Sequence, residues 1–112
     1  MEKKTVNILG TEYTVTECDK SEDKRLSDCD GFCDKTTKEI VVTKETPDSE
    51  LTNWEWYRRK ILRHEVIHAF FMESGLQENF ENQRYGISET FVDWFAIQSP
   101  KIFKVFQELD IL

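Results

Sequence analysis

Hydrophobic and polar residues alternate near the start of the chain in the way that half-buried strands require. Residues 5–9 and 11–16 are rich in Val, Ile, Thr and Tyr. Gly10 and Thr11 lie between the two runs and suit a tight turn with glycine at positive φ. The pattern therefore predicts a β-hairpin.

A second pair of strands is predicted further along the first half. Residues 31–33 and 39–43 have strand composition, and the polar residues 34–38 connect them. Residues 17–28 carry alternating charges and one large apolar residue, Leu26, which indicates a solvated loop with room for a short helical turn. Three or four strands are expected in total.

After Pro47 the hydrophobic residues recur with the spacing of a helix instead of that of a strand. No Gly or Pro occurs again until Gly75, so one long helix is predicted over this stretch. At 100° per residue its two opposite faces are both apolar, and we expect it to be buried on two sides. One face carries Tyr57, Ile61, His64, His68 and Phe71, and the other carries Leu62, Val66, Ala69 and Phe70.

Two further helices are predicted after a polar connector. Ser88 can cap a helix over residues 89–98, and Ser99 with Pro100 reads as the N-cap and first turn of another. Strands precede helices, which is typical of the α+β class. We expect a small antiparallel or mixed sheet of three to four strands, packed on the long helix and the two further helices.

Composition limits the classes of protein that this chain can belong to. Its 112 residues suit a single domain spanning residues 1–112. Fifteen basic against 22 acidic residues give a net charge of −7, the wrong sign for binding nucleic acid. The longest apolar run is residues 69–72, far short of a membrane span, and no signal-type segment is seen. The sequence therefore predicts a soluble cytoplasmic protein.

Three cysteines are too few for a disulfide scaffold, and reduced thiols are expected. Cys29 and Cys33 have a C-x3-C spacing, but no second Cys or His pair completes a structural zinc site, and Cys18 alone does not supply one. The three cysteines are therefore interpreted as small strand and turn residues and not as metal ligands.

The most informative segment is an H-E-x-x-H motif formed by His64, Glu65 and His68 within the predicted long helix. Residues four apart in a helix project side by side, so both imidazoles can reach one Zn2+. Zinc lowers the pKa of bound water to about 7, and Glu65 can accept the proton of that water and pass it to a departing amine. Hydrolysis of a peptide bond is the chemistry that this arrangement serves best.

A catalytic zinc needs a third protein ligand. The extended metzincin motif would require Gly at position 71 and His at position 74, where this chain has Phe71 and Ser74. In a second known pattern of zinc ligands, the third ligand is a glutamate from a following helix. Glu89 and Asp93 form an E-x-x-x-D sequence, one helical turn apart, with 20 residues between His68 and Glu89.

With these two motifs the chain resembles the gluzincin clan of zinc peptidases, and most of all its minimal members, the minigluzincin and ImmA/IrrE-like proteins of bacteria, phages and mobile elements. The resemblance implies one Zn2+ per chain, held by His64, His68 and Glu89, with Glu65 as general base. It also implies that Asp93 orients a ligand histidine. Relatives of this kind are associated with the cleavage of repressors.

The chain lacks a third histidine that could stabilise the oxyanion, as larger gluzincins do. Tyr85 is the first substitute to consider, and Tyr57 and Arg84 are the others. The leading hypothesis is a zinc-dependent endopeptidase whose protein or peptide substrate adds as a strand to an edge of the small sheet. The basic residues at positions 58, 59, 60 and 63 are interpreted as scaffold.

Two alternatives stay open. A catalytically inactive interaction module could keep the same fold, with or without zinc. A deformylase-like amide hydrolase would also use H-E-x-x-H, but it would take its third ligand from an upstream cysteine, Cys33 or Cys29. Oligomeric state and substrate identity are not predicted.

Overall fold

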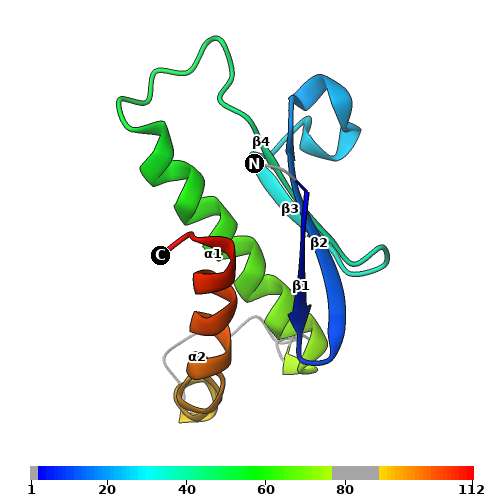
Figure 1. The fold of residues 1–112 in the computed structure, drawn as a ribbon, viewed down its shortest axis with the longest axis vertical. Coiled ribbons are helices and arrows are strands. Elements are labelled where there is room, and N and C mark those ends of the chain that lie inside the picture. The colour runs from blue at the N-terminus through cyan, green and yellow to red at the C-terminus, as the bar shows by residue number, and fades with distance from the viewer. Residues whose placement is uncertain (1–2, 77–88) are drawn as a thin grey trace.

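The structure is a computed structural model, and it combines one four-stranded sheet with two long helices (Figure 1). It describes residues 3–76 and 89–112, apart from the side chains at positions 89, 90, 92, 93 and 96. The predicted α+β class is confirmed. Among the described residues, no helix is both long enough and apolar enough to cross a membrane.

The sheet is mixed, with the strand order β1-β2-β4-β3. The four strands are β1 (Lys4–Ile8), β2 (Thr11–Cys18), β3 (Gly31–Asp34) and β4 (Glu39–Thr43). β1 and β2 form the predicted hairpin, β3 and β4 form the second antiparallel pair, and β2 joins the two pairs by running parallel to β4. The β1–β2 turn is made by Leu9 and Gly10, whose φ angles of 52° and 94° match a two-residue hairpin turn.

The loop between β2 and β3 contains two short 3-10 helices, η1 (Lys20–Glu22) and η2 (Lys24–Leu26). The side chain of Leu26 is fully buried, so the one large apolar residue of this charged segment fixes the loop to the domain.

Helix α1 (Trp54–Glu73) begins later than the sequence pattern predicted. The side chain of Asn53 accepts a hydrogen bond from the backbone N–H of Trp56 and caps the first turn. Residues 48–53 lie outside the helix. The helix ends at Glu73, and Gly75 follows with a φ of 80°, as expected for a residue just beyond a helix C-terminus.

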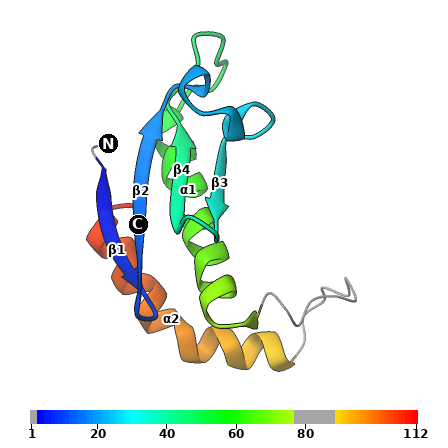
Figure 2. The ribbon, with the colours of Figure 1, turned by 90° about the vertical axis from the view of Figure 1, so that its right-hand side faces the viewer.

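Helix α2 (Glu89–Leu109) replaces the two helices predicted for this stretch. Ser99 and Pro100 lie inside one continuous helix, so the prediction of a new helix start at Pro100 was wrong. Proline removes one backbone hydrogen bond and bends a helix without having to end it. Figure 2 shows the result: α2 changes direction, with its first part beneath the end of α1 and its second part beside the sheet.

Both helices cover the same face of the sheet (Figures 1 and 2). α1 packs mainly against β3 and β4, whereas α2 packs against β1. The core between these layers is aliphatic and aromatic. It contains Val6, Ile8, Tyr13, Val15, Ile40, Val42, Ile61, Leu62, Val66, Ala69, Phe70, Ile102, Val105, Phe106, Leu109 and Ile111.

The end of α1 is tied to the sheet by a polar cluster around Glu73. Its carboxylate accepts hydrogen bonds from Thr11 Oγ1 at 2.8 Å, from Tyr13 OH at 2.7 Å and from Lys38 Nζ at 2.8 Å. Partial burial raises the pKa of Glu73, but these three donors outweigh it and hold the pKa below its ordinary value of 4.5. The cluster joins three segments that are distant in sequence.

Replacing Glu73 by glutamine is expected to lower the free energy of unfolding by about 1–3 kcal/mol at pH 7, because Gln cannot serve all three donors. The depressed pKa means that the carboxylate stabilises the fold fully above pH 4.5 and loses this effect as the pH falls through the folded-state pKa. Urea unfolding at pH 7 and pH 3 measures both effects, with the exposed Glu108→Gln as control. If Glu73→Gln and Glu108→Gln lowered the free energy of unfolding by the same amount, the prediction would be contradicted.

Candidate metal centre

His64, Glu65 and His68 meet in the middle of α1, and their ligand atoms all lie within 4.8 Å of one another. The Nε2 atoms of the two histidines are 3.1 Å apart, and the rings meet edge to face with their centroids 4.7 Å apart. No other group of this kind occurs in the part of the chain that the structure describes. The predicted pairing of the two imidazoles is confirmed.

The two faces of α1 differ in burial, so the expectation of a helix buried on both sides is confirmed only in part. Leu62, Val66, Ala69 and Phe70 are buried. On the histidine face Ile61 is buried, Tyr57, His68 and Phe71 are partly exposed, and His64 is exposed. Burial, and then the nearby charge of His64, lower the pKa of His68. An open histidine face leaves room for a ligand beside the rings.

Glu65 is the buried member of the group, with 6% of its surface exposed. Burial raises the pKa of its carboxyl from 4.5 to about 7. It lies against Gly31 at the start of β3: a Cβ atom at Gly31 would come within 3.3 Å of Glu65 Oε2 and 3.1 Å of Val42 Cγ1. A larger residue at position 31 would force the Glu65 carboxylate or Val42 to move by a few tenths of an ångström, so glycine leaves the space that the carboxylate uses.

The first turns of α2 dock beside His68 through aromatic residues. Phe71, one turn beyond the histidine pair, contacts Phe91 and Trp94 at centroid distances of 6.2 and 4.9 Å. Trp94 Nε1 donates a hydrogen bond to Ser74 Oγ at 3.1 Å. These contacts bring the first turns of α2, which begins at Glu89, to the last turn of α1, beyond His68.

The remaining residues of the predicted site are outside the described part of the structure. Glu89 is the first residue of α2, but its side chain is not described, and neither is that of Asp93. Tyr85 and Arg84 lie within residues 77–88. The third ligand, the orienting carboxylate and the oxyanion donor therefore stay predictions.

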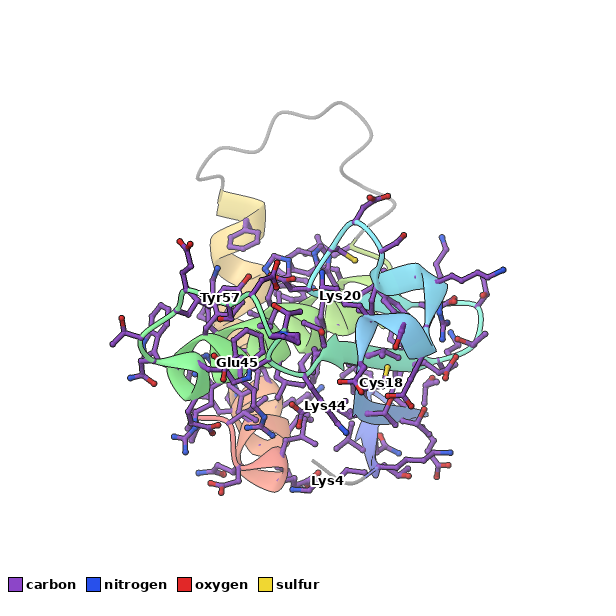
Figure 3. All side chains as sticks on the ribbon, turned by 90° about the horizontal axis from the view of Figure 1, so that it is seen from above. Lys4, Cys18, Lys20, Lys44, Glu45 and Tyr57 are labelled. Atoms are coloured by element: carbon purple, nitrogen blue, oxygen red, sulfur yellow. The ribbon has the colours of Figure 1, made fainter. Side chains whose placement is uncertain are left out.

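Tyr57, the other tyrosine considered, hydrogen-bonds through its hydroxyl to a carboxylate oxygen of Asp30, just before β3. Lys20 Nζ binds the other oxygen of Asp30 at 3.0 Å. The hydrogen bond to Asp30, followed by burial, raises the pKa of Tyr57. Figure 3 labels Tyr57, which comes from α1, and Lys20, which comes from η1, in a view from above. The Tyr57 hydroxyl thus serves to join α1 to β3.

The cysteines are all free, and none joins the histidine group. Cys29 Sγ donates to the carbonyl of Arg25 at 3.2 Å, and Cys33 Sγ lies 3.9 Å from Met72 Sδ. The structure brings neither proposed cysteine ligand of the deformylase-like alternative to the histidines.

The basic residues before the motif make structural contacts. Arg58 pairs with Glu17 at 3.0 Å, Arg59 pairs with Glu55 at 3.0 Å, and Arg63 donates to the carbonyl of Ile111 at 2.8 Å. Their interpretation as scaffold agrees with these contacts.

Sequence reasoning missed Gly31 as part of the site. The only signal was its place at the start of a predicted strand, and the contact with Glu65 depends on how β3 lies over α1. Comparison of the chain with known protein families, with curated proteins and with solved structures found no match.

Proposed function

We propose that this chain is a zinc-dependent endopeptidase of the gluzincin type, with His64 and His68 as zinc ligands and Glu65 as general base. The observation that carries the proposal is a buried carboxylate next to two converging imidazoles on one helix. A tetrahedral zinc with ligand nitrogens at about 2.0–2.1 Å holds them roughly 3.3 Å apart. The observed separation of 3.1 Å fits that requirement.

Glu89 is proposed as the third ligand and Asp93 as the carboxylate that orients a ligand histidine. The support for Glu89 is its position at the start of α2, which the contacts of Trp94 with Phe71 and Ser74 hold against the end of α1. The 20 residues that separate His68 from Glu89 are in keeping with the resemblance to the gluzincin pattern.

Zinc, when bound, polarises the scissile carbonyl and lowers the pKa of a bound water to about 7. Glu65 accepts a proton from the attacking water and delivers it to the departing amine. The support for both transfers is that the Glu65 carboxylate lies within 4.8 Å of the ligand nitrogens of His64 and His68. Gly31, by lacking a side chain, leaves space beside the Glu65 carboxylate.

The substrate is proposed to bind as an extended strand along the outer edge of β3. Within the described residues β3 pairs with β4 alone. Thr43 N–H donates to the carbonyl of Asp30, so residues 30 and 43 form a hydrogen-bonded pair, and pairs of this kind alternate along an antiparallel ladder. The peptide groups of Gly31 and Cys33 therefore point away from β4, towards an added strand.

The test is the zinc content of the purified protein by elemental analysis. We expect about one zinc per chain in the parent and in Glu65→Gln, and loss of zinc in His68→Ala and Glu89→Ala, because two remaining ligands hold zinc weakly. Glu12→Ala, a glutamate on β2 remote in sequence from the motif, is the matched control. A parent that takes up no zinc even after loading would overturn the proposal.

A zinc-loaded protein that cleaves no peptide would leave the interaction module as the function of this fold. Zinc retained in Glu89→Ala would remove Glu89 from the ligand set and leave the two histidines in place.

A further inference from the structure

A depression of about 420 Å³ borders the outer edge of β3, close to the proposed catalytic residues. It is lined by residues from β3, from η2 and from the last turns of α1, together with the residue that follows β3. These residues are Arg25, Phe32, Cys33, Asp34, Lys35 and Met72.

The depression lies next to the place where a substrate strand would pair. Cys33, whose peptide groups point outward, is two residues from Gly31, which contacts Glu65. Two residues of a strand span roughly 6.6 Å. Met72 follows His68 by one helical turn. A side chain entering the depression therefore belongs to a residue within about two positions of the bond that is cleaved.

The inner wall of the depression is uncharged. The Cys33 thiol and the Met72 thioether lie 3.9 Å apart. Burial, and then the charge of Glu65, raise the pKa of the Cys33 thiol to about 12, so the sulfur stays protonated at neutral pH. Both sulfur groups are polarisable, and the methionine side chain adapts to the shape of its neighbour.

Arg25 on the rim does not supply a site for an anion. Its guanidinium binds Asp23, Asp34 and Glu39 at 2.9, 2.8 and 3.2 Å, and it lies 4.3 Å above the centroid of the Phe32 ring. Three carboxylates neutralise the Arg25 guanidinium, and its plane extends the apolar wall that Phe32 begins. Lys35, the second cation of the lining, is exposed.

We propose that this depression is a specificity subsite that takes an uncharged, unbranched or γ-branched apolar side chain, such as Met or Leu, of an extended peptide. The inference rests on the proposed peptidase function and names the class of substrate for it. At the inner wall formed by Cys33 and Met72 a charged side chain is disfavoured, because it would lose water there without gaining a charged or hydrogen-bonding partner from these two residues.

The test uses ten-residue labelled peptides of Gly, Ala and Ser with a single Met, Leu, Asp or Lys, moved in turn through the positions around the cleaved bond. For the zinc-loaded parent, kcat/KM is expected to be at least about tenfold higher for Met and Leu than for Asp and Lys at one of these positions. Met72→Leu is expected to keep this preference, Met72→Ala to reduce it severalfold, and Met72→Lys to shift it towards Asp. Ile97→Ala, at an exposed position on α2, is the control.

Zinc content and circular dichroism confirm that each variant is folded. Equal rates for charged and apolar peptides, or a preference unchanged in Met72→Lys, would overturn the subsite while the peptidase stands. If no peptide is cleaved, the peptidase proposal fails, and anisotropy with the same peptides and Glu65→Gln decides the subsite. Tighter binding of the Met and Leu peptides would support the subsite, and equal binding would overturn it.

Discussion

Glu65→Gln is expected to lower the rate of peptide hydrolysis by about 10²–10⁴-fold while the protein keeps its zinc. Glutamine has nearly the size of glutamate, so it fits the space beside Gly31, but it cannot accept the proton of the attacking water. Because the variant removes a buried carboxylate, we expect its unfolding temperature to be no lower than that of the parent. The measurements are turnover of a peptide substrate, zinc content and thermal unfolding.

The contrast with His68→Ala separates the two roles proposed within the motif. His68→Ala is expected to lose both zinc and turnover, whereas Glu65→Gln loses turnover only. Full activity in Glu65→Gln would remove the general base from the mechanism. Loss of zinc in that variant would instead make Glu65 a ligand.

Phe70→Ala is expected to lower the free energy of unfolding by about 3–5 kcal/mol, the range for removing a buried aromatic ring. Phe70 is 1% exposed and belongs to the core between α1 and the sheet. Truncation leaves a cavity behind the helix that carries the histidines. Urea unfolding followed by circular dichroism measures the loss.

Phe103→Ala is the matched control, because Phe103 lies on α2 with 47% of its surface exposed. It is expected to cost much less than Phe70→Ala, since surface changes are usually within about 0.5 kcal/mol. A loss below about 1 kcal/mol for Phe70→Ala would contradict the packing described here.

The local features of the fold were readable from the sequence. The hairpin turn at Gly10 needs positive φ, and glycine supplies it. The approach of His64 and His68 follows from helical periodicity alone, because residues four apart always lie on neighbouring turns. These features depend on a few adjacent residues, which is why a pattern can predict them.

Features set by tertiary contacts were not predicted correctly or not predicted at all. Pro100 has a local preference for a helix start, but packing on both sides of it, by the partly buried Trp94 and the buried Phe106, holds a continuous helix against α1 and the sheet. The later start of α1 depends on the helix cap at Asn53. Several polar residues precede this helix, and the sequence pattern does not single out Asn53 among them. The contact of Gly31 with Glu65 joins segments 34 positions apart and leaves no periodic signal.

The continuity of α2 also affects how far α1, the helix that carries the two histidines, can tilt. Near its start, Trp94 binds Ser74 just beyond the end of α1. After its last turn, the carbonyls of Ile111 and Leu112 accept hydrogen bonds from Arg63 and Arg59 in the first half of α1. A tilt of α1 would break contacts at one of these two places, so the distance between the histidines and β3 is braced from both ends. For the substrate strand proposed above, we therefore expect access from the outer edge of β3 and not from a rocking motion of α1.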